Sequence, residues 1–125
     1  MEFLYAAELK KRFTCYGHFY ELVMMDGERA RCRSVLEIVD TSIPQEIPSD
    51  ISGMEPDVVV IMMNPGSSHP KDIYHIDGEI EYPQSNGSMR KELVLTQPDN
   101  TQYQVMRVAV AKGWRHIRVL NLSDL

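Results

Sequence analysis

The chain has 125 residues and a mass of 14.4 kDa, which is the size of one ordinary domain. Hydrophobic residues make up 43% of it and charged residues 25%, as in globular proteins, so wholesale disorder is excluded. No apolar run approaches the roughly 20 residues that cross a bilayer, so no membrane partner is expected. The formal net charge of −5 argues against nucleic acid as the main ligand.

The sequence contains two cysteines, Cys15 and Cys32, and their number helps to predict the cellular compartment of the protein. The N-terminus lacks a basic region followed by an apolar core, which a secretion signal requires. A secreted chain of this size usually carries more cysteines. We therefore expect a cytoplasmic protein in which both thiols are reduced and pack as small buried hydrophobes. Their spacing matches no zinc site, and no cofactor is expected.

The first elements are a short helix over residues 2–13 and a hairpin of two strands over residues 16–25 and 29–39. Asp26-Gly27 lies between the strands and predicts a type I′ turn, in which both central residues have positive φ. Six basic residues accompany these elements, and we expect them on solvated faces, with nucleic-acid contact as the alternative. They are Lys10, Lys11, Arg12, Arg29, Arg31 and Arg33.

Residues 57–63 read Asp-Val-Val-Val-Ile-Met-Met, after a proline-containing connection over residues 41–56. An uninterrupted apolar run of this kind predicts a strand buried on both faces, as in a parallel sheet covered by helices. The next stretch, residues 67–97, is polar and rich in turn residues. Irregular stretches of that length are usually functional or mobile.

A helix is predicted over residues 101–112, with Asn100 or Thr101 as its cap and Gly113 as a left-handed C-terminal cap. Its apolar stripe consists of Val105, Met106, Ala109 and Val110. A strand over residues 116–122 follows. Strand, loop, helix and strand form a crossover unit, which places its two strands parallel in one sheet.

These elements predict a single α/β domain over residues 1–125, made of a hairpin (14–40), a linker (41–56) and a β-loop-α-β unit (57–125). The sheet is expected to be mixed, partly parallel, with the N-terminal antiparallel hairpin and flanking helices, in a three-layer Rossmann-like or glycosylase-like arrangement. Another helix normally follows the last strand of such a domain. We therefore expect the chain to be C-terminally truncated or naturally short.

The candidate site lies where the two parallel strands end, because ligands of open parallel sheets bind beyond the carboxyl ends of the strands. A small-molecule or nucleotide-like ligand is expected there. Gly66 lets a backbone approach closely, and serine hydroxyls offer donors to a phosphate or carboxylate. The expected ligand-binding residues are Asn64, Pro65, Gly66, Ser67, Ser68, Thr101 and Asn121. The candidate catalytic residues are Asn64, His69 and Asp99, and whether a reaction occurs is left open.

Each of these features has a purely structural alternative. Asn-Pro-Gly favours a turn by itself, and Asn121 alone suits a strand-end capping role. His69, His75 and Asp77 have spacings that match no metal motif, so no metal is expected. His18 and His116 are expected at strand edges.

Three motifs in order resemble the bacterial and phage family called domain of unknown function 1643. In that family an apolar strand ends in Asn-Pro-Ser, an Asp-Pro-Thr opens a helix, and a later strand ends in Asn-Leu. Here the counterparts are Met63-Asn64-Pro65-Gly66, Asp99-Asn100-Thr101 and Asn121-Leu122. Gly66 replaces the usual serine and Asn100 the proline. The resemblance spans residues 16–125 and implies a fold and candidate residues, but no activity.

A weaker resemblance is to the uracil-DNA glycosylase superfamily, in which an Asn-Pro-Gly strand end holds the attacking water. It implies that role for Asn64, although the superfamily's late His-containing loop has no counterpart here. The remaining alternative is a non-enzymatic interaction module, completed by a partner or by the missing continuation of the chain. Whether the protein forms a homo-oligomer is left open. Such a module predicts an exposed apolar patch of more than about 400 Å² near the last strand.

Overall fold

The structure, a computed structural model, describes residues 4–23, 25–43, 51–66, 69–71, 79–81 and 93–124. Its elements in chain order are α1 (Ala6–Arg12), β1 (Phe13–Val23), β2 (Arg29–Asp40), β3 (Val58–Met62), β4 (His69–Pro70), β5 (Glu79–Glu81), β6 (Val94–Gln97), α3 (Asn100–Lys112) and β7 (His116–Asn121). None of the helices in these ranges is long and apolar enough to cross a membrane. The predicted α/β class is confirmed.

The described strands form one mixed sheet in the order β3-β7-β2-β1-β6-β4, with β5 beside β1. β3 and β7 are parallel neighbours, with Val58 opposite Ile117 and Met62 opposite Asn121. This confirms the predicted crossover unit. The hairpin strands β1 and β2 are antiparallel, and β2 also pairs antiparallel with β7. The hairpin therefore extends the same sheet.

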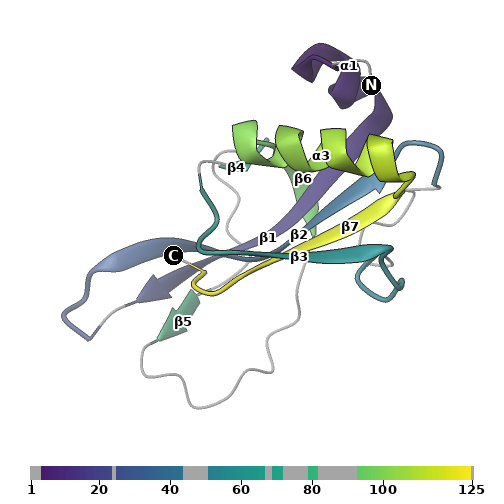
Figure 1. Ribbon diagram of the computed structural model, residues 1–125. Coiled ribbons are helices and arrows are strands. Elements are labelled where there is room, and N and C mark those ends of the chain that lie inside the picture. The colour runs from purple at the N-terminus through teal and green to yellow at the C-terminus, as the bar shows by residue number, and fades with distance from the viewer. Residues whose placement is uncertain are drawn as a thin grey trace.

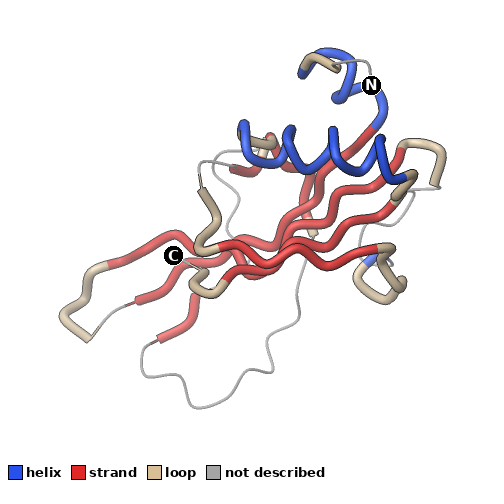
Figure 2. Tube along the Cα trace, viewed as in Figure 1, coloured by secondary structure: helices blue, strands red, loops and turns tan. Residues whose placement is uncertain are grey.

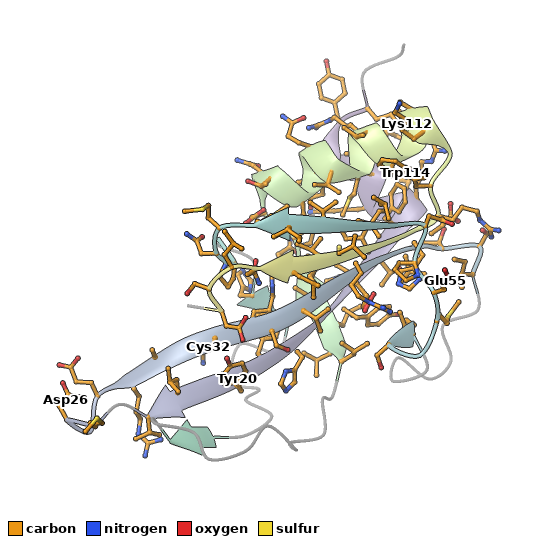
Figure 3. The ribbon with its side chains drawn as sticks, turned by 60° about the horizontal axis from the view of Figure 1, so that its bottom comes forward. Tyr20, Asp26, Cys32, Glu55, Lys112 and Trp114 are labelled. Carbon is orange, nitrogen blue, oxygen red and sulfur yellow. The ribbon has the colours of Figure 1, made fainter. Side chains whose placement is uncertain are left out.

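Helices α1 and α3 both lie on one face of the sheet (Figure 1, Figure 2). Alternate strand residues pack against them in the larger core, and Trp114 lies beneath the end of α3 (Figure 3). The buried residues of this core are Leu9, Phe13, Cys15, Leu36, Ile38, Tyr103, Met106, Ala109, Ile117 and Val119. A second cluster, which includes Tyr16, Val35, Val39, Ile51 and Leu93, fills the opposite face. A three-layer arrangement requires a further layer on that face. Residues 44–50, which lie between Ile43 and Ile51 of the second cluster, are outside the described residues, so the three-layer arrangement stays a prediction.

Helix α3 is capped by Asp99, so the prediction that Asn100 or Thr101 caps it was wrong. The Asp99 carboxylate accepts a hydrogen bond from the Gln102 backbone N–H at 3.0 Å, and the Gln102 side chain accepts one from the Asp99 N–H at 2.6 Å. This reciprocal pair satisfies two donors at once, which a lone asparagine or threonine cap does not. The predicted left-handed cap at Gly113 is confirmed by a φ of 74°.

The hairpin turn is not type I′. Gly27 has a φ of 87°. Every described residue with a positive φ is a glycine, so the φ of Asp26 is not positive. Instead, the Asp26 carboxylate accepts a hydrogen bond from the Glu28 N–H at 2.9 Å. An aspartate that bonds the backbone two residues ahead stabilises an ordinary turn, in which only the glycine is left-handed.

Strand β3 packs against the core on one face only and is partly buried there, so the prediction of burial on both faces was wrong. Val58, Val60 and Met62 pack on the helix-covered core, whereas Val59 is 47% and Ile61 64% exposed. The reason is the position of β3 at the end of the sheet, where the helices cover one side. An apolar sequence alone does not reveal that the second face lacks a cover.

The prediction that His18 and His116 lie at strand edges was wrong. Both side chains are buried, and their strands, β1 and β7, each have a neighbouring strand on either side. His18 is 2% and His116 3% exposed. His18 contacts Ser34 Oγ through Nδ1 at 2.7 Å, and His116 contacts Glu37 Oε1 through Nε2 at 2.7 Å. Cys15 and Cys32 are free and buried, as predicted.

Candidate functional site

The two strand ends lie side by side, as the sequence predicts, because Met62 is the register partner of Asn121. The turn that follows β3 is stabilised by its own asparagine: Asn64 Oδ1 accepts a hydrogen bond from the Gly66 N–H at 3.1 Å. Gly66 has a φ of 70°, which favours glycine. Asn64 thus has the turn-forming role that was the structural alternative, and its side chain is exposed.

Asn121 connects the end of β7 to β2. Its Nδ2 donates to the Arg33 carbonyl at 3.2 Å, and its Oδ1 accepts from Arg33 Nη2 at 3.4 Å. Arg33 Nη1 donates to the Pro65 carbonyl at 3.2 Å. Asn121 and Pro65 therefore hold the Arg33 guanidinium at the strand-end turn.

A β-bulge explains why Arg33 points to this turn. His18 is paired with Val35 and Phe19 with Arg33, so Ser34 is an extra residue in β2. Without it, Arg33 would share the face of Val35, away from the helices. The bulge moves Arg33 to the face of its partner Phe19 instead, and such irregularities commonly redirect a side chain at a functional site. The prediction that Arg33 belongs to a solvated face was wrong, since it is 1% exposed.

Arg33 supplies a fixed positive charge. Burial lowers the pKa of the guanidinium to about 10, while the negative charge of Asp99 acts in the opposite direction. That pKa lies well above neutral pH, so Arg33 stays protonated under ordinary conditions. A buried cation interacts more strongly with an anion than an exposed one does, because water screens it less.

A pocket of about 120 Å³ opens beside this guanidinium, and we call it the strand-end pocket. Its wall combines cationic and apolar side chains from four segments of the chain. The lining residues are Phe19, Arg31, Cys32, Arg33, Pro65, Gly66, His69 and Pro70. The His69 imidazole is oriented by a 3.0 Å hydrogen bond from Nδ1 to the Pro70 carbonyl. Of the predicted site residues, Pro65, Gly66 and His69 therefore meet in one cavity.

The cap of α3 meets the strand-end turn at Gly66. A Cβ at this position would lie 2.5 Å from Asp99 Oδ2, so the motifs around Asn64 and Asp99 are in contact. Asp99 does not line the strand-end pocket, and its Oδ1 is used by the helix cap. Thr101 is exposed on the first turn of α3, and Ser67 and Ser68 lie outside the described residues.

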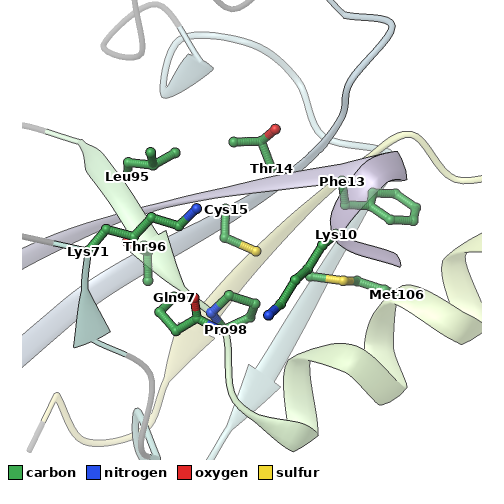
Figure 4. Close-up of a pocket in the computed structure, with 10 residues that line it drawn as sticks. All are labelled: Lys10, Phe13, Thr14, Cys15, Lys71, Leu95, Thr96, Gln97, Pro98 and Met106. Atoms are coloured by element: carbon green, nitrogen blue, oxygen red, sulfur yellow. The ribbon is translucent and has the colours of Figure 1, made fainter. Parts of the chain in front are cut away.

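A second pocket, of about 100 Å³, lies between α1, β1 and β6 (Figure 4). Lys10 and Lys71 line it on either side of Cys15. Burial raises the pKa of the Cys15 thiol to about 12, despite the opposing charges of Arg33 and Lys71. Cys15 is therefore a neutral thiol at physiological pH, and it lacks the lowered pKa of a catalytic nucleophile.

Metal-ligating side chains do not gather in groups of three or more anywhere in the described ranges. His75 and Asp77 lie outside those ranges. His69 lies beside two guanidiniums in the strand-end pocket, where a metal cation would meet electrostatic repulsion.

Arg31 and Arg33 line the strand-end pocket although the sequence did not predict them there. Their alternation with Arg29 looked like a solvated strand face, and the bulge at Ser34 has no sequence signature. One signal was available: three arginines on one strand of a chain with a net charge of −5 are a local excess of positive charge. The water-holding role that the glycosylase resemblance implies for Asn64 stays a prediction, which release of free base from uracil-containing DNA would test.

The strand-end pocket therefore combines a buried arginine, an exposed arginine and an oriented imidazole at the end of a parallel strand pair. Such a pocket suits the recognition of a negatively charged group. Comparisons of the chain with protein-family models, with curated proteins and with solved structures gave no match.

Proposed function

We propose that the protein binds a small anionic ligand in the strand-end pocket, through a carboxylate or phosphate group of that ligand. The observation that carries the proposal is the buried, bulge-directed Arg33, which lines the pocket together with Arg31. The chain as a whole carries a net charge of −5, so a general excess of positive charge on the protein does not explain why two arginines line this pocket.

The geometry of a guanidinium suits this class of ligand. Its planar fork of N–H donors matches two oxygens of a carboxylate or phosphate. Arg33 is already held by Pro65 and Asn121, so ordering it on binding costs little conformational entropy. Arg31 is exposed at the pocket and can close over the anion from the solvent side.

The size of the pocket limits what it encloses. Pockets that enclose whole drug-sized ligands usually measure roughly 300–1,000 Å³. About 120 Å³ accommodates the acidic group and a few further atoms. A nucleotide would place its phosphate here and its remainder outside the pocket.

Isothermal titration calorimetry with inorganic phosphate, and separately with a nucleoside monophosphate and a small dicarboxylate, tests the proposal. The informative variant is Arg31→Gln, because it removes a pocket charge from an exposed position. The matched control is Arg29→Gln on the same strand, where the arginine instead contacts Glu21 at 2.7 Å. Both variants change the net charge equally.

We expect at least one of these anions to bind the wild type and Arg29→Gln with similar affinity. Arg31→Gln should bind that anion roughly tenfold or more weakly, since a hydrogen bond to a charged group contributes about 1.5–3 kcal/mol. Absence of binding to all three anions would refute the proposal, and so would equal affinities of the two variants.

A further inference from the structure

The hydrogen bond of His69 in the strand-end pocket determines which of its ring nitrogens carries a proton. Strand β4 is held by antiparallel pairing with β6, in which His69 lies opposite Gln97. His69 Nδ1 lies 3.0 Å from the Pro70 carbonyl oxygen. Because a carbonyl oxygen can only accept a hydrogen bond, Nδ1 must be the donor, and Nε2 of the neutral ring therefore carries the lone pair.

This Nε2 is the one strong side-chain acceptor among the described residues that line the pocket. Arg31 and Arg33 offer only N–H donors, and the Cys32 thiol is a weak hydrogen-bonding group. The other lining residues are a phenylalanine, a glycine and two prolines, which have no polar side chains. The carbonyls of the prolines, Pro65 and Pro70, already accept hydrogen bonds from Arg33 and from the imidazole itself.

The Nε2 atom of His69 is available to a ligand. The side chain is exposed, and within the described ranges no hydrogen bond engages this nitrogen. A ligand in the pocket therefore meets guanidinium donors together with one acceptor. Charged oxygens suit the donors, but an oxygen without a proton would turn its lone pair toward the lone pair of Nε2. The acceptor is satisfied only by a ligand that also brings a donor.

We propose that the strand-end pocket selects an anion that carries a hydroxyl group beside its charged oxygens, and that His69 determines this specificity. Arg31 and Arg33 bind the charged oxygens, and His69 Nε2 accepts a hydrogen bond from the hydroxyl. This selectivity rests on the proposed binding of an anion in the pocket and names the class of that anion. A site that hydrogen-bonds a hydroxyl discriminates against an analogue without one, because its acceptor is then left unpaired.

Two kinds of small anion share this chemistry. Near pH 8, inorganic phosphate retains one hydroxyl, and a 2-hydroxy carboxylate such as lactate has a hydroxyl on the carbon next to its carboxylate. Sulfate, an unsubstituted carboxylate such as propionate, and the phosphate of a fully ionised monoester lack such a group. In a cavity of about 120 Å³, one compact anion can reach the guanidiniums and the imidazole together.

Calorimetric titration at about pH 8, where an ordinary histidine side chain is neutral, tests the proposal with two matched pairs of ligands. One pair is phosphate and sulfate, which have nearly the same charge and size at this pH, and the other is lactate and propionate. The informative variant is His69→Ala, which removes the acceptor at an exposed position. The control is Arg31→Gln, which removes a charged donor of the same pocket and keeps the imidazole. Circular dichroism verifies that each variant is folded.

We expect the wild type to bind the hydroxyl-bearing member of at least one pair about tenfold or more tightly than its matched analogue. The pair that shows the preference identifies the source of the hydroxyl. Arg31→Gln should weaken both members alike and keep their ratio, whereas His69→Ala should bring the ratio to within about twofold. Equal wild-type affinities within both pairs, or a preference that survives His69→Ala, would overturn the proposed selectivity and leave anion binding intact. A pocket that binds none of the four anions would contradict the proposed function as well.

Discussion

At the scale of single residues, the strand-end turn depends on Gly66 for two separate reasons. Its φ of 70° lies in the left-handed region, which a side chain with a Cβ adopts at a cost of roughly 1–2 kcal/mol. Its Cα also faces Asp99 so closely that a Cβ would lie 2.5 Å from Oδ2. The turn and the helix cap can approach each other only because this position has no side chain.

Gly66→Ala should therefore lower the free energy of unfolding by about 2–4 kcal/mol, the sum of backbone strain and the displacement of Asp99. Gly27→Ala separates the two effects, because Gly27 has a φ of 87° and no atom within 4 Å of the added Cβ. We expect Gly27→Ala to cost about 1 kcal/mol in urea unfolding. Equal losses in the two variants would show that the contact with Asp99 is unimportant.

Cys15 should be unreactive in the folded protein. Its pKa is raised from 9.0 to about 12 by burial, so the reactive thiolate is scarce at pH 8. In a Cys32→Ser background, we expect iodoacetamide to label Cys15 far more slowly in buffer than in urea. Rapid labelling of the native protein would contradict the assigned environment.

The same pKa shift has a consequence for stability. A folded-state pKa above the unfolded value favours the folded state at low pH, so this contribution is complete below about pH 9 and is lost as pH rises toward 12. Stability should therefore fall more steeply across this range in the wild type than in Cys15→Ala. Urea unfolding at several pH values measures the difference, and parallel curves would refute the assignment.

At the scale of elements, a buried ionic cluster joins β2 to β7 on the face away from the helices. Glu37 is fully buried and accepts hydrogen bonds from His116 at 2.7 Å and from Arg118 Nε at 2.8 and 3.0 Å. Arg118 Nη2 also donates to the carbonyls of Ile51, Ser52 and Met54. The cluster thereby fixes the connection before β3 against the sheet.

Glu37→Ala should lower the free energy of unfolding by about 3–5 kcal/mol, because it leaves Arg118 and His116 without their buried anion. Glu21→Ala is the matched control, since Glu21 contacts Arg29 at a similar 2.7 Å but on an exposed part of the hairpin. That substitution should cost less than about 1 kcal/mol. Chemical denaturation measures both losses, and similar values would contradict the role of burial.

Some of these elements were predictable from the sequence and others were not. The parallel pair β3–β7 followed from the strand-helix-strand pattern, and the Gly113 cap from the need for a left-handed residue. The position of the hairpin beside β7 depends on long-range pairing, which local patterns do not encode. The Arg33 orientation depends on a single extra residue in β2, and the same register slip would redirect any side chain at that position.

At the scale of the whole molecule, the placement of both described helices on one face separates the strand-end pocket from the uncovered face of β3 and β7. On the helix-covered side, Arg33 contacts Pro65 and Asn121 at the end of the parallel pair and lines the strand-end pocket. On the other side, β3 and β7 present their uncovered apolar residues. The proposed anion site and the exposed apolar side chains therefore lie on opposite faces of the sheet.

The central claim, that an anion binds in the strand-end pocket, is tested most directly by mapping amide chemical-shift changes in a nuclear magnetic resonance titration with inorganic phosphate. We predict that the largest changes occur at Arg31, Cys32, Arg33, Gly66 and His69, and that they saturate. Changes concentrated at Lys10 and Lys71 around the second pocket, or the absence of saturable changes, would contradict the claim.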